Sequence, residues 1–161
     1  MAFYHFTTLC MVVAAIYIQQ SDACSCNVVP NFPFRYCAYG LVFRGEVKNE
    51  TLDRMGNLGY EDKYVYTVKV KKTYKATELA NERISKDDTV QLETPKYGSL
   101  CGRPLRVGGD YLISVTRYEV ALNSAAMAIN MCEWIEEFDN VSLADKYNLE
   151  NDFECPTLDF D

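Results

Sequence analysis

Five segments of the chain alternate between apolar and polar residues with the period of a half-buried β-strand. Leu41–Val47 and Tyr64–Tyr74 give the clearest signals, and the second is rich in valine, threonine and tyrosine. The other three segments are 89–94, 111–117 and 126–132, and turn residues separate them. Five strands at this spacing, without helices between them, predict a mainly β fold that forms a small closed or partly open barrel.

Two segments that flank the predicted strands have a helical pattern instead. Residues 31–40 are rich in aromatic residues and end at Gly40, which predicts one or two helical turns. Ser142 followed by Asp145 has the form of an N-cap with an acidic partner, so a helix is expected over 143–149. Residues 49–61 are polar, contain two glycines, and are expected to form a loop or hairpin connection.

An apolar run at the start of the chain has the features of a secretory signal. It covers residues 6–18, which is short for a membrane span, and Ser21 and Ala23 place small residues at the −3 and −1 positions of a cleavage site. The alternative is a buried N-terminal helix or a membrane anchor. We expect cleavage after Ala23, which leaves a signal peptide, 1–23, and one secreted, extracellular domain, 24–161, without membrane insertion.

Cleavage at this position would change the inventory of reactive side chains. The full chain has seven cysteines and one histidine, and Cys10 and His5 would leave with the leader. An even number of cysteines in a secreted chain predicts disulfides, and their wide spacing disfavours a zinc site. A bond between Cys24 and Cys26 would close a strained ring, so both should reach distant partners, and the remaining pairings stay open. The six cysteines are Cys24, Cys26, Cys37, Cys101, Cys132 and Cys155.

The charge and the missing histidine exclude several classes of function. A mature chain without histidine or free thiols cannot form a Ser-His-Asp or Cys-His nucleophilic site, so we do not expect an enzyme. A net charge of −7 disfavours nucleic acid and anionic lipid as partners. The most basic run, Lys69–Lys72, could be a heparin or nucleic-acid patch, but the solvated face of a strand is the favoured interpretation. Composition therefore favours a binding or inhibitory module.

Two N-glycosylation sequons suit a secreted glycoprotein. They are Asn49-Glu50-Thr51, in the expected loop, and Asn140-Val141-Ser142, beside the expected helix cap.

Three cysteine motifs in order give the chain a family resemblance. Cys24-Ser25-Cys26 stands at the expected mature N-terminus, followed by Leu100-Cys101-Gly102 and then Cys132-Glu133-Trp134-Ile135. Together they resemble the N-terminal inhibitory domain of the tissue inhibitors of metalloproteinases, in particular the short one-domain forms of nematodes, from Cys24 to Cys155. The resemblance implies a five-stranded OB-like (netrin-like) barrel with short flanking helices. It also implies three disulfides: Cys24–Cys101, Cys26–Cys132 and Cys37–Cys155.

The resemblance also implies a mechanism and a partner. In that family the free α-amine and the carbonyl oxygen of the first cysteine chelate the catalytic zinc of the protease, which would be the role of Cys24. The side chain of Ser25 would enter the primary specificity pocket of the protease. The chain would be a monomer with no cofactor of its own, and its partners would be extracellular zinc metalloproteinases. The implied protease-binding residues are Cys24, Ser25, Cys26, Asn27, Val28, Gly98, Ser99 and Leu100.

One segment departs from the family pattern. The family places a proline early after the second cysteine, whereas here Asn27, Val28 and Val29 precede Pro30. The alternative hypothesis is therefore a netrin-like binding module that engages an extracellular or host receptor and does not inhibit proteases.

Overall fold

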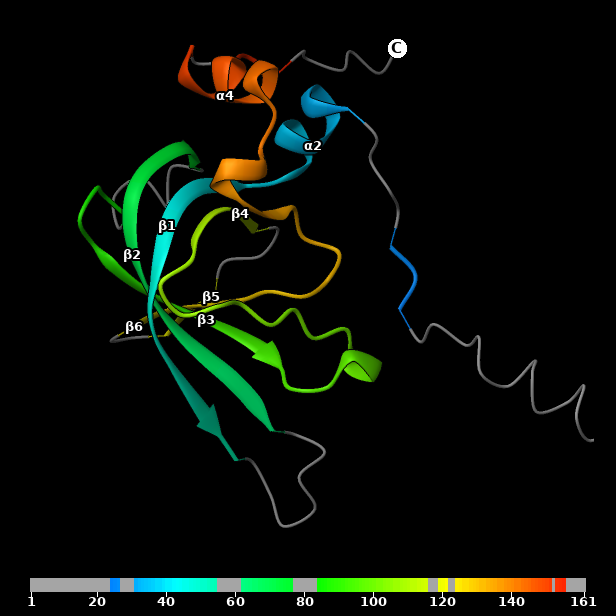
Figure 1. Cartoon of the computed structure of the whole chain (residues 1–161), viewed down its shortest axis with the longest axis vertical. Helices are drawn as coiled ribbons and strands as arrows, with labels where there is room; N and C mark the ends of the chain where they lie inside the picture. The colour runs from blue at the N-terminus through cyan, green and yellow to red at the C-terminus, as the bar shows by residue number, and fades with distance from the viewer. Residues whose placement is uncertain are drawn as a thin grey trace, which may run out of the picture.

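The computed structural model describes residues 24–26, 31–54, 62–76, 84–115, 119–121, 124–151 and 153–155. The expected leader and its cleavage site lie outside these residues. The described chain is mainly β, as predicted, with one curled sheet and two short helices (Figure 1). Of the helices that the structure describes, none is long and apolar enough to cross a membrane. The elements are α2 (Phe32–Ala38), β1 (Leu41–Asp53), β2 (Lys63–Ala76), β3 (Thr89–Pro95), the 3-10 turn η1 (Gly98–Leu100), β4 (Asp110–Val115), β5 (Glu119–Ala121), β6 (Ser124–Ala128), β7 (Ile135–Glu137), the 3-10 turn η2 (Phe138–Asn140) and α4 (Leu143–Glu150).

The sheet has seven strands in the order β5-β6-β3-β2-β1-β4-β7. Neighbouring strands are antiparallel except β3 and β6, which run parallel. Register shifts in β1 at 42/43, 44/45 and 47/49 mark bulges against β2, and bulges increase the local bend and twist of a strand. Within the described residues no strand pairing joins β5 to β7, so the barrel is open there.

The main core lies inside the curl of the sheet and follows the alternation seen in the sequence. Leu41, Phe43 and Val47 of β1 are buried, and so are Tyr66, Val68 and Val70 of β2. Burial raises the pKa of the Tyr66 phenol to about 12, and its oxygen accepts a hydrogen bond from the backbone N–H of Leu105 at 3.1 Å.

A second core lies under α2 and α4, which Figure 1 shows side by side. Phe32 stacks on Tyr36 with ring centroids 5.4 Å apart, and Trp134 and Phe153 meet Phe32 edge to face at 5.9 and 5.3 Å. The predicted cap of α4 is present, because the Ser142 hydroxyl accepts from the backbone N–H of Asp145 at 3.0 Å. Both predicted helices are confirmed.

Some expected boundaries were wrong. Residues 49–53, expected in a loop, continue β1 and pair with 63–67 of β2. Their side chains are mostly exposed, so no hydrophobic alternation signals the strand. The strand expected over 126–132 ends at Ala128, since the Asn130 side chain accepts from the backbone N–H of Cys132 at 2.8 Å and turns the chain. Strands β5 and β7 raise the expected five strands to seven.

Candidate functional site

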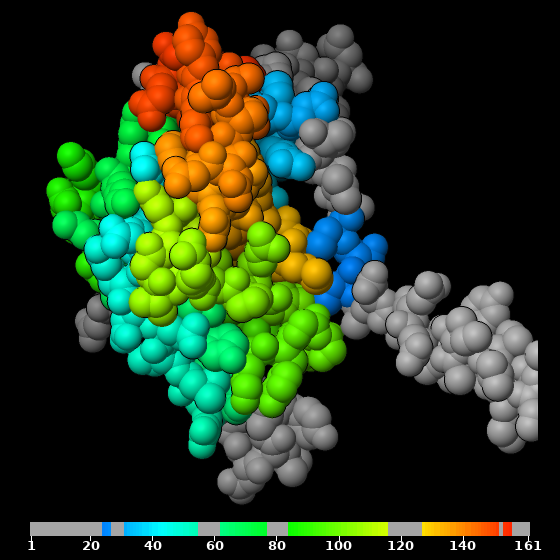
Figure 2. All heavy atoms as spheres, viewed as in Figure 1, coloured from blue at the N-terminus to red at the C-terminus, as the bar shows by residue number. Residues whose placement is uncertain are grey.

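Two disulfides fasten the segment 24–26 to the body of the protein. Cys24 is bonded to Cys101 and Cys26 to Cys132, with Cα–Cα distances of 5.6 and 5.2 Å. Ser25, between them, is exposed. Figure 2 shows this segment in blue at the surface of the molecule, alongside the chain near residue 130. Two adjacent bridges leave the backbone of 24–26 little freedom while its outer side faces solvent.

The third disulfide joins a different part of the molecule. Cys37, in α2, is bonded to Cys155 near the C-terminus, and both cysteines pack against the second core. The three bridges are the three pairs that the family resemblance implied.

Cys101 closes a tight turn that follows η1. Its backbone is left-handed, with φ at 65°, and its N–H donates to the carbonyl of Gly98 at 2.9 Å. Cysteine rarely adopts this conformation, so surrounding contacts must hold it. The carbonyl oxygen of Gly98 also lies 3.7 Å from the sulfur of Cys24. The η1 turn therefore lies directly beside the first of the two tethered cysteines.

Gly102 explains why a glycine follows this cysteine. A Cβ at Gly102 would collide with the carbonyl of Pro95, and the Gly102 N–H donates to the carbonyl of Tyr97 at 3.2 Å. The loop can close back on the end of β3 only because this position carries no side chain.

The buried carboxylate of Asp62 contacts the start of the same loop, which follows β3. Asp62 is only 5% exposed, and its Oδ2 lies 3.1 Å from the ammonium of Lys96. The Lys96 N–H also donates to the Asp62 carbonyl at 3.0 Å. The other carboxylate oxygen, Oδ1, is buried without a hydrogen-bond partner, which costs stability. The sequence carries no signal for this role of Asp62, because the residues next to it give no indication of burial.

The segment 130–133 forms the second support of the tethered terminus. The Met131 N–H donates to the carbonyl of Cys101 at 2.9 Å, so the two disulfide-bearing loops are joined through their backbones. The Asn130 N–H donates to the Glu133 carboxylate at 2.8 Å. Residues 130–132 were expected in a strand, whereas β6 ends at Ala128. We call residues 24–26, 97–101 and 130–133 the anchored ridge.

Large apolar side chains are exposed along the anchored ridge. Tyr97, Leu100 and Met131 are 41%, 48% and 45% exposed. Of the three, Leu100 lines an apolar cavity of about 490 Å³ between the end of β3, η1 and the chain after β6, together with Cys101 and Cys132. An exposed apolar side chain at the edge of an apolar cavity is a feature of surfaces that bind a partner.

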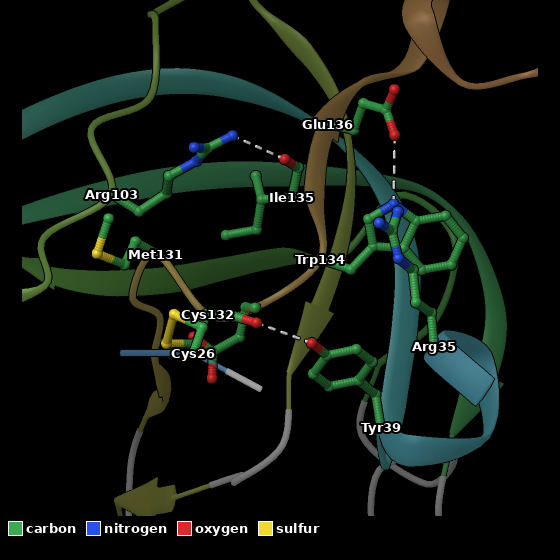
Figure 3. Close-up of a pocket in the computed structure, with 10 residues that line it drawn as sticks. Cys26, Arg35, Tyr39, Arg103, Met131, Cys132, Trp134, Ile135 and Glu136 are labelled. Carbon is green, nitrogen blue, oxygen red and sulfur yellow. Dashed lines mark hydrogen bonds between the residues drawn. A yellow bond between two sulfur atoms is a disulfide. The ribbon is translucent and has the colours of Figure 1, made fainter. Parts of the chain in front are cut away.

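A second cavity, of about 380 Å³, is lined by both cysteines of the Cys26–Cys132 bridge and by Met131 (Figure 3). Its walls are tied together by polar contacts. Arg35 lies over the Trp134 ring at 5.7 Å, and the indole N–H donates to Glu136 at 3.3 Å. The hydroxyl of Tyr39 donates to the Cys132 carbonyl at 2.9 Å. These contacts connect the ridge with α2 and β7.

The basic run does not present unpaired charge. Lys69 pairs with Asp87 at 2.9 Å, Lys71 with Asp110 at 2.9 Å, and Lys72 with Glu150. Paired lysines attract a polyanion less than a cluster without acidic partners does, so this finding favours the solvated face of a strand over a heparin patch.

The predicted site residues fall into three groups. Cys24, Ser25 and Cys26 are brought beside Gly98–Leu100, whereas Asn27 and Val28 lie outside the described residues. The sequon residues Asn49, in β1, and Asn140, in η2, are both exposed. In the described part of the chain, no group of three or more His, Cys, Asp or Glu side chains could hold a metal ion.

Comparison with known proteins assigns the chain to a family. A search of curated proteins found no match. A family model described as "Tissue inhibitor of metalloproteinase" matches residues 22–156, which include all six cysteines of the three disulfides. Members of this family are protein inhibitors of metalloproteinases rather than enzymes. Because the match spans most of the chain, including the anchored ridge and the second core, this protein belongs to the tissue inhibitor of metalloproteinase family.

Proposed function

We propose that this protein is a secreted inhibitor of zinc metalloendopeptidases that binds the catalytic zinc of its target through Cys24. The observation that carries the proposal is the anchoring of Cys24 to the η1 turn, beside exposed apolar side chains. A surface built in this way presents a fixed backbone and apolar contacts to the cleft of a protease.

The chemistry of a terminal cysteine suits such a zinc. The catalytic zinc of a metalloprotease has three protein ligands and keeps one position for water. An α-amine and the carbonyl of the same residue can form a five-membered chelate and displace that water. An α-amine titrates near pH 8, so it releases its proton to a metal close to neutral pH. This role requires cleavage after Ala23, because only then does Cys24 carry a free amine.

The ridge would lower the entropic cost of binding. The two bridges at Cys24 and Cys26 and the backbone bond from Met131 to Cys101 fix the segment before it meets a protease. Pre-organisation of this kind raises affinity, since less freedom is lost on association. Ser25, exposed between the bridges, would enter the specificity pocket, and Gly98–Leu100 would bind beside it.

The remaining parts of the proposal concern the mature protein. We propose a monomeric domain of residues 24–161 with no cofactor of its own, active outside the cell after removal of residues 1–23. Asn49 and Asn140 are the proposed glycosylation sites. Asn27 and Val28 are proposed to follow the ridge into the substrate groove.

The test compares two forms of the mature protein. One begins at Cys24, and the other carries one additional alanine before it. Both are assayed against a panel of matrix metalloproteinases, and peptide mapping establishes that both contain the three native disulfides. We expect the first form to inhibit and the second to lose at least about 100-fold in affinity, because an acylated nitrogen cannot bind zinc as an amine does.

Two results would contradict the proposal. Equal inhibition by both forms would exclude chelation by Cys24. If both forms are inactive while their disulfides are native, the alternative of a receptor-binding module without inhibitory activity is favoured.

A further inference from the structure

We propose that Met131 is an oxidation site, and that conversion of its thioether to the sulfoxide weakens binding of the target protease. This inference rests on the proposed inhibitory function and adds a means of regulating it.

Met131 lies between the two bridges that hold the tethered terminus. Its N–H donates to the carbonyl of Cys101, the partner of Cys24, at 2.9 Å. The next residue, Cys132, is the partner of Cys26. A change at the Met131 side chain therefore occurs on the ridge itself, next to the segments proposed to meet a protease.

The side chain of Met131 is open to small oxidants. It is 45% exposed, whereas Met127, only four residues earlier, is 0% exposed and belongs to the main core. Figure 3 shows Met131 at the edge of the cavity that also contains Arg103. The two methionines thus form a matched pair, one accessible and one protected, on the same short segment of chain.

The reaction with a peroxide is balanced without any further reagent. A lone pair of the thioether sulfur attacks one oxygen of hydrogen peroxide, the O–O bond breaks, and the departing hydroxide takes the proton of the transferred oxygen and leaves as water. The sulfur loses two electrons and the peroxide gains them. The product is a polar sulfoxide in place of a flexible apolar group. When the ridge docks, this S=O group must lose its hydration, which costs free energy unless the protease supplies a donor.

The experiment uses the mature protein, with Cys24 as its first residue, and hydrogen peroxide as the oxidant. Peptide mapping by mass spectrometry follows the oxidation of each methionine, and the inhibition constant is measured before and after treatment. We expect Met131 to be oxidised well before Met127. The inhibition constant should rise about 10-fold, the effect of one poorly compensated polar group, and methionine sulfoxide reductase should restore the starting value.

A matched variant separates Met131 from every other methionine, including Met55, which lies outside the described residues. In Met131→Leu the ratio of inhibition constants after and before treatment should stay near one. The proposal is overturned if Met127 reacts as fast as Met131, if oxidised Met131 leaves inhibition unchanged, or if Met131→Leu loses as much as the wild type. An untreated protein that inhibits no metalloproteinase overturns the proposed function, and this inference falls with it.

Discussion

The anchored ridge and the second core use disulfides for different purposes. On the ridge, two bridges hold a short segment whose central residue, Ser25, faces solvent, and apolar side chains such as Leu100 are exposed around it. Under α2 and α4, Cys37–Cys155 packs against the second core, whose buried rings include Phe32 and Trp134. The first arrangement fixes the backbone of a short segment at the surface, and the second adds a covalent bond to elements that already pack together.

The bridges in the two regions should therefore differ in their effect on affinity for the protease, but not in their effect on stability of the fold. The covalent loops are of similar length, with sequence separations of 77 for Cys24–Cys101 and 118 for Cys37–Cys155. Their effects on the unfolded chain should therefore be similar, because the entropy of loop closure grows only with the logarithm of length. The two bridges differ in their surroundings, because the first fixes an exposed segment and the second joins elements of the second core.

Removing one bridge from each region gives the largest expected effects. Cys24→Ser with Cys101→Ser, and Cys37→Ser with Cys155→Ser, should each lower the free energy of unfolding by about 4–5 kcal/mol. Only the first pair should also weaken inhibition, on the order of 100-fold, since several residues of the ridge then lose their fixed backbone. Urea unfolding and inhibition assays at a temperature where both variants stay folded measure the two quantities. Equal losses of inhibition would remove the distinction between the regions.

Truncating one large side chain in each region tests the same contrast at single residues. Trp134→Ala removes a buried ring and should cost about 3–5 kcal/mol of stability. Leu100→Ala, at an exposed position, should change stability by less than about 0.5 kcal/mol while weakening inhibition. Thermal unfolding and inhibition constants are the measurements. A Leu100→Ala variant with wild-type affinity would show that η1 does not contact the protease.

The polar cluster beside the second core should make stability depend on pH. Burial raises the pKa of Asp110, but the hydrogen bonds from Arg44, at 2.7 Å, and Lys71, at 2.9 Å, outweigh it and leave the pKa below its usual value. The guanidinium of Arg44 also lies 3.7 Å from the centre of the Phe138 ring. A lowered folded-state pKa stabilises the protein above the unfolded pKa, near 4, and this contribution disappears as pH falls through the folded value.

Asp110→Asn should therefore be less stable than the wild type at pH 7 by about 1 kcal/mol, given the partial exposure of the pair. The difference should shrink in urea titrations at progressively more acid pH. A gap that stays constant down to pH 2 would show that the carboxylate charge contributes nothing.

At the cap of α4 a local effect on stability, without an effect on inhibition, is expected. Ser142→Ala removes the acceptor for the Asp145 N–H and should cost about 1 kcal/mol. Ser142→Thr keeps an acceptor and should cost less. Both proteins are made without glycosylation, because Ser142 also belongs to the sequon of Asn140, and their unfolding is compared. Neither change should affect inhibition. Weaker inhibition by Ser142→Ala would mean that the conformation of α4 affects the ridge.

The sequence predicted those elements whose buried faces alternate or whose caps are local. Apolar alternation predicts β1 up to Val47 and β2, because the period of a strand reports which side chains are buried. The spacing of Ser142 and Asp145 predicts the cap of α4 in the same direct way. Residues 49–53 were missed because a strand exposed on both faces has no apolar alternation. Asp62 and Met131 were missed for a different reason. Their roles depend on contacts with Lys96 and Cys101, which are distant in sequence, so no local pattern reports them.

The order in which the cysteines occur has a consequence for biosynthesis. Cys24 leaves the ribosome early, but its partner Cys101 is 77 residues behind, and the partner of Cys26 is 106 residues behind. At about 5–20 residues per second, both thiols wait for seconds before either partner exists. Oxidation during that interval could join Cys24 or Cys26 to Cys37, which emerges first. The N-terminal end of this protein is thus synthesised early and secured late, and correct pairing there depends on isomerisation or on delayed oxidation.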